Sequence, residues 1–217
     1  MTFLVKICGL STPETLDVAL DAGADMVGFV FFPASPRHVS FETARSLASR
    51  IKDRARKVAL TVNADDALLE NIVAALKPDM LQLHGHETPE RVAAVRERFG
   101  LPVMKVLAIE TKSDLAAVPN YTNVADRLLF DARPPCGATR PGGLGKPFDW
   151  HLLENLNLSI PFMLSGGLHA GNVAEALRFT RAPGVDVSSG VESAPGVKDP
   201  DKIRAFIRAA RSAKVPA

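Results

Sequence analysis

A cysteine at the end of a short apolar run is the first residue that could carry chemistry. Cys8 closes the run Leu4–Cys8, and Lys6 lies two positions before it. Because side chains alternate along a strand, Lys6 and Cys8 share a face. A nearby ammonium group lowers the pKa of a thiol, so Cys8 is a candidate base or nucleophile. The alternative is that Cys8 is only a small buried hydrophobic residue.

An aspartate ends a second apolar run. Asp131 closes Arg127–Asp131, where a carboxylate is costly unless it is used or paired. A functional acid is one interpretation, and a helix cap or a salt bridge with Arg133 is the other. If both runs are strands of one parallel barrel, their ends face each other across its mouth. A small substrate would then fit between Cys8 and Asp131.

Three clusters of small residues could hold an anion: Gly142-Gly143-Leu144-Gly145, Ser165-Gly166-Gly167 and Ser188-Ser189-Gly190. Glycine lets backbone N–H groups approach an anion closely, and a helix N-terminus adds positive potential. Any one cluster alone is typical of a tight turn. In a (β/α)8 barrel, however, the loops after the seventh and eighth strands form the common phosphate site. The last two clusters therefore predict a phosphorylated substrate.

The pair His84 and His86 raises the question of a metal site. A hydrolytic zinc site normally needs further ligands at other strand ends, and His38, His151 and His169 end none of the expected strands. No metal is therefore expected. His84 is interpreted as a polar lining group, and His86 as a residue at a helix entry.

Arg37 is a candidate for binding a carboxylate. It follows Phe32-Pro33-Ala34-Ser35-Pro36, on the loop expected after the second strand. A guanidinium group there could pair with a substrate carboxylate in a forked geometry. A lone arginine on a loop is otherwise simply solvated.

Eight short apolar runs are expected to be the strands that position these residues. They are Leu4–Cys8, Met26–Phe31, Val58–Thr61, Met80–Leu83, Val103–Leu107, Arg127–Asp131, Phe162–Leu164 and Gly184–Val187. Amphipathic runs between most of them predict helices, which open near Thr12-Pro13, Asp65, Thr88-Pro89, Gly171-Asn172 and Asp199-Pro200. The helical pattern is weakest over Asp149–Asn155.

The alternation of strands and helices predicts an α/β fold with a parallel sheet. Eight such units in 217 residues favour a single-domain (β/α)8 TIM barrel over residues 1–217. A doubly wound open sheet is the alternative. It usually has a Gly-rich dinucleotide loop after its first strand, and Cys8-Gly9-Leu10-Ser11 is not one.

The composition excludes several classes of protein. The formal net charge is +2, from 26 basic and 24 acidic residues, and no concentrated basic stripe predicts a nucleic-acid partner. Two cysteines are too few for a disulfide framework, so a reduced, cytoplasmic environment is expected. Neither a targeting segment nor a membrane helix is expected, because Lys6 interrupts the apolar N-terminus and later apolar stretches contain Pro and Gly.

Several motifs form an ordered set over nearly the whole chain. They are Lys6-Ile7-Cys8-Gly9-Leu10, Gly28-Phe29-Val30-Phe31, Ser35-Pro36-Arg37, Gln82-Leu83-His84-Gly85, Phe130-Asp131, Gly142-Gly143-Leu144-Gly145, Ser165-Gly166-Gly167-Leu168 and the segment 184–192. This set resembles that of the phosphoribosylanthranilate isomerase family. The stretch Pro134-Pro135-Cys136-Gly137-Ala138 is less typical of that family.

The resemblance implies an Amadori rearrangement in tryptophan biosynthesis. N-(5′-phosphoribosyl)anthranilate would become 1-(2-carboxyphenylamino)-1-deoxyribulose 5-phosphate. By family role, Asp131 would be the general acid that protonates the furanose ring oxygen. Cys8, as thiolate, would be the general base that removes the C2′ proton. The resemblance implies no cofactor.

The resemblance also assigns the binding residues. Arg37 would hold the anthranilate carboxylate. The other substrate-binding residues would be Lys6, Gln82, His84 and Asp186. The phosphate would be held around Gly143, Gly145, Gly166, Gly167, Ser188, Ser189 and Gly190.

Two other functions remain open from the residues alone. One is a Schiff-base aldolase on a similar barrel, with Lys6 or Lys105 as nucleophile. The other is a non-catalytic barrel that binds a sugar phosphate. The chain is expected to be a monomer or a homodimer.

Overall fold

Eight parallel strands pair in chain order, and the eighth pairs with the first, so that the sheet closes into a barrel. The strands are β1 (Leu4–Cys8), β2 (Met26–Phe31), β3 (Arg56–Thr61), β4 (Met80–Leu83), β5 (Val103–Ile109), β6 (Arg127–Ala132), β7 (Phe162–Leu164) and β8 (Gly184–Val187). The computed structural model describes residues 2–145, 147–154 and 156–213. The predicted (β/α)8 barrel is confirmed, and the doubly wound alternative is wrong.

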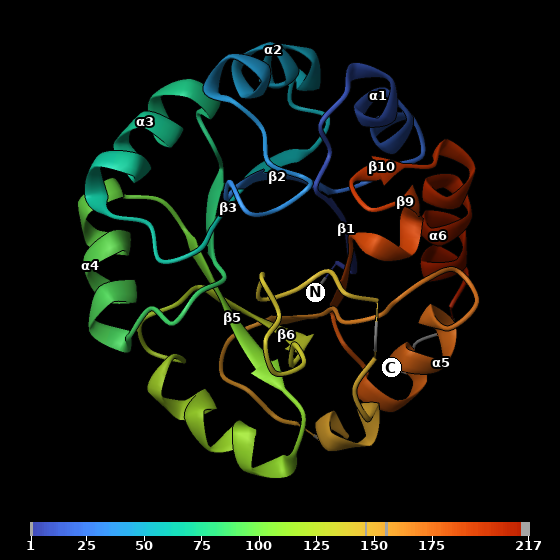
Figure 1. Ribbon diagram of the computed structural model, residues 1–217. Coiled ribbons are helices and arrows are strands. Elements are labelled where there is room, and N and C mark those ends of the chain that lie inside the picture. The colour runs from blue at the N-terminus through green and yellow to red at the C-terminus, as the bar shows by residue number, and fades with distance from the viewer. Residues whose placement is uncertain (1, 146, 155, 214–217) are drawn as a thin grey trace.

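In the described part of the chain, six α-helices surround the strands (Figure 1). They are α1 (Pro13–Asp21), α2 (Phe41–Ile51), α3 (Asp66–Leu76), α4 (Pro89–Phe99), α5 (Val173–Thr180) and α6 (Pro200–Ser212). The five predicted starts are confirmed, and α2, for which no start was predicted, begins after Ser40. The side chains of Thr12, Asp65 and Thr88 accept hydrogen bonds from backbone N–H groups of the first turn. Such caps satisfy donors that have no partner inside the helix.

Two connections differ from the α-helices of the other units. The segment after β5 forms a 3₁₀ helix, η1 (Lys112–Asn120), and the one after β6 forms only η2 (Trp150–Leu153). Pro119 inside η1 has no N–H to donate, which disfavours a regular α-helix there. The weak helical pattern of Asp149–Asn155 therefore yields one short turn, and its last residue, Asn155, lies outside the described residues.

A small hairpin, which the sequence pattern does not predict, follows β8. The 3₁₀ helix η3 (Ser189–Val191) leads into β9 (Glu192–Ala194), which pairs antiparallel with β10 (Val197–Lys198). Pro195 and Gly196 make the turn between them, with Gly196 at a φ of 83°. The hairpin carries Glu192 and Lys198, both buried, to the rim of the barrel.

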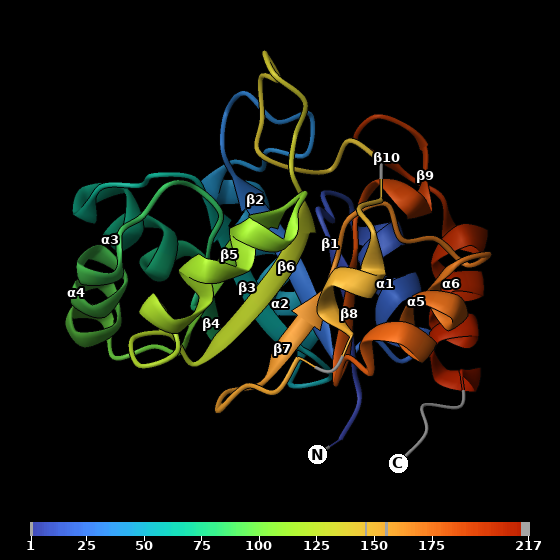
Figure 2. The ribbon, with the colours of Figure 1, turned by 90° about the horizontal axis from the view of Figure 1, so that it is seen from below.

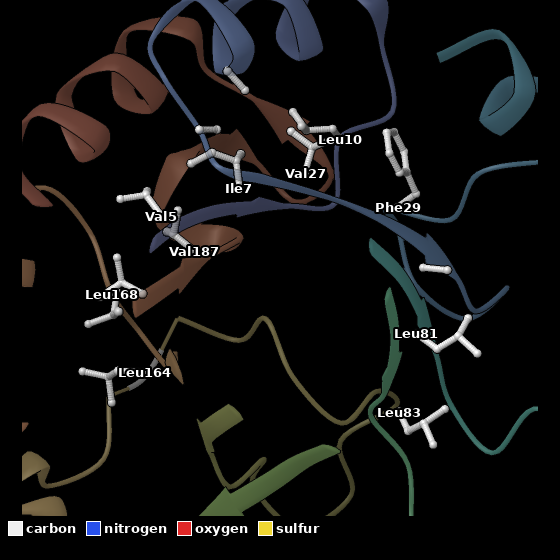
Figure 3. Packing of buried hydrophobic residues seen from close by; sticks show 14 of the residues in the cluster. Val5, Ile7, Leu10, Val27, Phe29, Leu81, Leu83, Leu164, Leu168 and Val187 are labelled. Atoms are coloured by element: carbon white, nitrogen blue, oxygen red, sulfur yellow. The ribbon is translucent and has the colours of Figure 1, made fainter. Parts of the chain in front are cut away.

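The core has two parts, because strand side chains alternate between the barrel interior and the helices. Odd-numbered residues of the first two strands, such as Val5, Ile7, Val27 and Phe29, belong to the large cluster shared with the helices (Figure 3). Four methionines and neighbouring aliphatic side chains fill the interior below the mouth: Met26, Met80, Met104 and Met163, with Leu4, Val58, Val106 and Leu129. The barrel interior is therefore filled with side chains up to the level of its mouth.

The loops after β2 and β6 rise together above the carboxyl ends of the strands (Figure 2). Active sites of this fold lie at that end. None of the described helices has the length and apolar character needed to cross a membrane.

Candidate active site

A pocket at the carboxyl ends of the strands collects most of the predicted site residues. Twelve of them line it: Cys8, Arg37, Gln82, His84, Asp131, Gly143, Gly145, Gly166, Gly167, Asp186, Ser188 and Ser189. Lys6 lies beneath the lining. Gly190 packs behind it, because a Cβ on Gly190 would lie 1.8 Å from the carbonyl oxygen of Leu168. Strands β1 and β6 thus bring Cys8 and Asp131 to one cavity, as predicted.

Cys8 is buried at the end of β1, on the interior face that it shares with Lys6. Gly28 on the neighbouring strand makes room for both side chains, since a Cβ there would lie 2.9 Å from the Cys8 sulfur and 3.1 Å from the Lys6 nitrogen. Burial raises the pKa of the Cys8 thiol, and the opposing effect of Lys6 is smaller. The expectation of a lowered thiol pKa is therefore wrong.

Lys6 and Asp186 form a buried ion pair beneath the thiol. Nζ of Lys6 lies 2.8 Å from Oδ1 of Asp186, and Lys6 has no exposed surface. Burial alone would lower the pKa of Lys6, but the Asp186 carboxylate and Cys8 outweigh burial, and the pKa is raised. Lys6 therefore stays charged. Oδ2 of Asp186 faces the Ser165 hydroxyl at 3.5 Å.

The side chain of Asp131 contacts His84 and not Arg133. Its Oδ2 lies 3.3 Å from Nε2 of His84, and its Oδ1 accepts the N–H of Ala132 at 2.9 Å. Arg133 pairs with Asp114 at 2.5 Å, so the alternative of an Asp131–Arg133 salt bridge is wrong. Gly142 covers the pair, because a Cβ on it would lie 2.6 Å from Asp131 Oδ2. The loop after β6 thus closes directly over Asp131.

Arg37 is buried, with 4% of its surface exposed, and is not a solvated loop residue. Its Nε and Nη2 donate to the two carboxylate oxygens of Glu192, at 2.6 and 2.8 Å. Nη2 also donates to the carbonyl oxygen of Gly143 at 3.2 Å. The fork therefore holds a carboxylate of the protein itself on its Nε–Nη2 edge. Nη1 lies beside Gly143, where a Cβ would be 2.5 Å from it, and it has no hydrogen-bond partner among the described residues.

Residues of all three predicted phosphate-binding clusters line the pocket, and a Cβ on Gly145 would lie 3.8 Å from the Ser189 hydroxyl oxygen. Gly166 and Gly167, at φ values of 84° and 64°, adopt left-handed backbone that favours glycine. A Cβ on Gly166 would also lie 2.6 Å from the backbone nitrogen of Ala132. Ser188 is fixed by its hydroxyl, which donates to the carbonyl oxygen of Cys8 at 3.1 Å. Backbone donors from three loops can thus converge on one anion.

Comparison with known proteins supports the family resemblance of the sequence motifs. A family model described as N-(5′-phosphoribosyl)anthranilate (PRA) isomerase matches residues 5–209. The chain belongs to this family. It is 69% identical over 212 residues to an N-(5′-phosphoribosyl)anthranilate isomerase of Bradyrhizobium diazoefficiens, covering 98% of this chain and 95% of that protein.

Solved structures of the same family share the barrel. The phosphoribosyl anthranilate isomerase of Thermotoga maritima superposes with a TM-score of 0.87 at 35% identity, covering 97% of this chain and 99% of that one. Another isomerase was solved with reduced 1-(o-carboxyphenylamino)-1-deoxyribulose 5-phosphate. It has a TM-score of 0.82 and 32% identity, with the same coverage of 97% and 99%.

In this member of the family, the site contains residues that motif reasoning did not assign a role. Glu192 pairs with Arg37, and Lys198 donates to Glu192 at 2.8 Å. Glu192 stands in a motif that was recognised, whereas Lys198 has no local signal. Arg140, from the loop after β6, also lines the pocket. Its reach into the mouth depends on the loop conformation, which a sequence pattern does not specify.

The histidine pair is separated in the structure. His84 lines the pocket, whereas His86 is exposed and its N–H donates to the side chain of Asn63 at 2.7 Å. Over residues 2–145, 147–154 and 156–213, no three His, Cys, Asp or Glu side chains cluster as metal ligands would.

Proposed function

We propose that this barrel rearranges N-(5′-phosphoribosyl)anthranilate to 1-(2-carboxyphenylamino)-1-deoxyribulose 5-phosphate in tryptophan biosynthesis, with Asp131 as acid and Cys8 as base. The observation that carries the proposal is the placement of Cys8 and Asp131 in one pocket. Membership of the isomerase family supports the reaction. This rearrangement needs one proton donor and one proton acceptor, held on either side of a small sugar.

The reaction begins at Asp131. Its protonated carboxyl group gives a proton to the ring oxygen, the C1′–O bond breaks, and the nitrogen lone pair forms the C=N bond of a Schiff base. His84, 3.3 Å from Asp131 Oδ2, holds the carboxyl group in place. Gly142 covers this pair, which keeps bulk water from the donated proton.

Cys8 performs the second step. Its thiolate removes the C2′ proton, the electrons of that C–H bond form the C1′=C2′ double bond, the π electrons of the C=N bond return to the nitrogen, and an enolamine forms. Tautomerisation of the enolamine then gives the ketone. Lys6, charged beneath the thiol, stabilises the thiolate, and Asp186 holds Lys6 there. These two predicted binding residues thus act on the base from below.

Substrate binding uses the remaining polar groups of the pocket. The Nη1 edge of Arg37 takes the anthranilate carboxylate. Gln82 has no exposed surface, and both ends of its side-chain amide lack a partner among the described residues. A buried amide without partners is costly, so Gln82 is suited to a sugar hydroxyl, which both donates and accepts. The phosphate binds the backbone of Gly143, Gly145, Gly166, Gly167, Ser188 and Ser189, with Gly190 supporting that loop.

A fluorescence assay tests the function. The substrate is made in situ from anthranilate and phosphoribosyl pyrophosphate with the upstream transferase, and loss of anthranilate-type emission is followed after this protein is added. Rapid loss is expected. Absence of loss with folded protein would contradict the proposal.

The proposal also covers the cellular compartment and the oligomeric state of the protein. Cys8 is buried as a free thiol and Cys136 is an exposed free thiol, which agrees with a reducing cytoplasm. The oligomeric state, monomer or homodimer, stays a prediction. Light scattering after size-exclusion chromatography measures which of the two forms in solution.

A further inference from the structure

A buried carboxylate lies at the centre of a network behind the proposed carboxylate-binding arginine. Both oxygens of Glu192 accept from Arg37, at 2.6 and 2.8 Å, and both side chains are 4% exposed. The two residues are 155 positions apart in sequence, so the hairpin after β8 and the loop after β2 meet only through the fold. A forked pair of this kind fixes the plane of the guanidinium group as well as its position.

Lys198 completes the network from the other strand of the hairpin. Its Nζ donates to Glu192 at 2.8 Å, to the Ser188 carbonyl oxygen at 2.8 Å and to the Ser188 hydroxyl at 3.2 Å. The Ser188 hydroxyl in turn donates to the backbone of Cys8. The hairpin therefore connects three parts of the site: the arginine, the serine loop and the strand that carries the base.

The charges of the network leave one positive charge for a ligand. Arg37 and Lys198 contribute two cations, and Glu192 contributes one anion. Burial alone would raise the pKa of Glu192, but its contacts with Arg37 and Lys198 outweigh burial and lower it, so the carboxylate is ionised. Burial lowers the pKa of Lys198 to about 8, against the attraction of Glu192. One uncompensated cation beside the pocket suits a substrate that carries a carboxylate.

We propose that Glu192, held by Lys198, is a positioning residue that aims the free Nη1 edge of Arg37 into the pocket and so sets the preference for a carboxylate-bearing substrate. This inference rests on the proposed role of Arg37 in binding the anthranilate carboxylate. Glu192 does not touch the substrate. Without it, Arg37 would keep its charge but lose the two hydrogen bonds that orient its plane.

The test compares two ligands that differ only in the carboxylate. One is the reduced product analogue with a 2-carboxyphenylamino group, and the other is its phenylamino counterpart. Their dissociation constants are measured by calorimetry at neutral pH for wild type, Glu192→Gln, Arg37→Met and the double variant. Glu192→Gln is expected to weaken the carboxylated ligand by about 10-fold and the other by less than about 2-fold. In the Arg37→Met background, Glu192→Gln is expected to add nothing.

A matched control removes a different buried carboxylate. Glu87 pairs with Lys105 at 2.7 Å, with side chains 3% and 2% exposed, and does not line the pocket. Glu87→Gln is expected to lower stability while leaving the ratio of the two affinities unchanged. If Glu192→Gln does not fold, Glu192→Asp replaces it, because the shorter side chain cannot hold both Nε and Nη2.

Three outcomes overturn the inference, and they distinguish the role of Glu192 from that of Arg37. Equal weakening of both ligands, or a preference that survives in Glu192→Gln, would show that Glu192 only stabilises the hairpin. A wild type with no preference for the carboxylated ligand would contradict the proposed role of Arg37, and the role of Glu192 would fail with it.

Discussion

The ammonium group of Lys6 lies 2.8 Å from Oδ1 of Asp186, and both residues are buried beneath the thiol of Cys8. A cation without access to solvent is costly unless it is paired. Here the pair retains a positive charge directly below the proposed base. Lys6 therefore favours the thiolate, whereas the Asp186 carboxylate that holds Lys6 in place acts in the opposite direction and raises the pKa of the thiol by less.

Lys6→Met is expected to damage both stability and activity. It removes the group that favours the thiolate and leaves the Asp186 carboxylate buried and unpaired. Breaking a buried pair in this way costs about 3–5 kcal/mol. Chemical denaturation measures this loss. Arg50→Met, which breaks an exposed pair with Asp17, is the control and is expected to cost much less. Equal losses for the two variants would contradict a structural role for Lys6.

The pH dependence of kcat/KM is expected to report the Cys8 thiol. Burial raises its pKa, and the base must be deprotonated to act, so kcat/KM should rise as pH increases through that raised pKa. The ascending limb should therefore lie above neutrality. In Lys6→Met, which lacks the stabilising cation, the limb should move to higher pH. A limb that stays in place would contradict the coupling of Lys6 to Cys8.

The depth of burial explains why the raised pKa of the Cys8 thiol could not be predicted from the sequence. The spacing of Lys6 and Cys8 correctly places both on one interior face. It does not show that the mouth is closed enough for burial to outweigh the cation. The eight strands, by contrast, depend on local apolar runs bounded by helix caps and glycines. Five of them have the predicted bounds, and β3, β5 and β6 extend one or two residues beyond the prediction.

Glu192 and Lys198 were assigned no role from the sequence because the residues they contact are not marked by any local pattern. Glu192 lies in a segment with no strand pattern, interrupted by Pro195 and Gly196, and its partner Arg37 comes from a distant loop. Nothing local marks Lys198 as buried. Likewise, the 3₁₀ turns after β5 and β6 replace α-helices where proline and loop residues interrupt the helical period.

Gly142→Ala tests the closure of the loop after β6. An alanine Cβ would lie 2.6 Å from Asp131 Oδ2 and 2.8 Å from the His84 ring, so either the loop or these two side chains must shift. Because a displacement of about 1 Å can cost about 100-fold in rate, kcat/KM is expected to fall by about 10- to 100-fold. The melting temperature should hardly change. Thr139→Ala, an exposed position on the same loop, is the control. Full activity in Gly142→Ala would show that closure over Asp131 is not required.

Borohydride trapping separates the isomerase from a Schiff-base aldolase. Lys6 is paired with Asp186, and Lys105 is held by Glu87 and by the Gly85 carbonyl oxygen at 2.7 Å. Lys105 also alternates with the interior residues Met104 and Val106, which places it on the helix-facing side of β5. Reduction in the presence of substrate is therefore expected to label neither lysine. Mass spectrometry showing a modified Lys6 or Lys105 would contradict acid–base catalysis by Cys8 and Asp131.

The most direct test of the central claim is the turnover of Cys8→Ala and Asp131→Asn in the fluorescence assay, beside their affinity for the reduced product analogue. Both variants should fold, bind the analogue within about 3-fold of wild type, and lose about 10²- to 10⁴-fold in kcat, the usual contribution of general acid–base catalysis. Retention of most of the wild-type rate in either variant would contradict the assignment of that residue as acid or base.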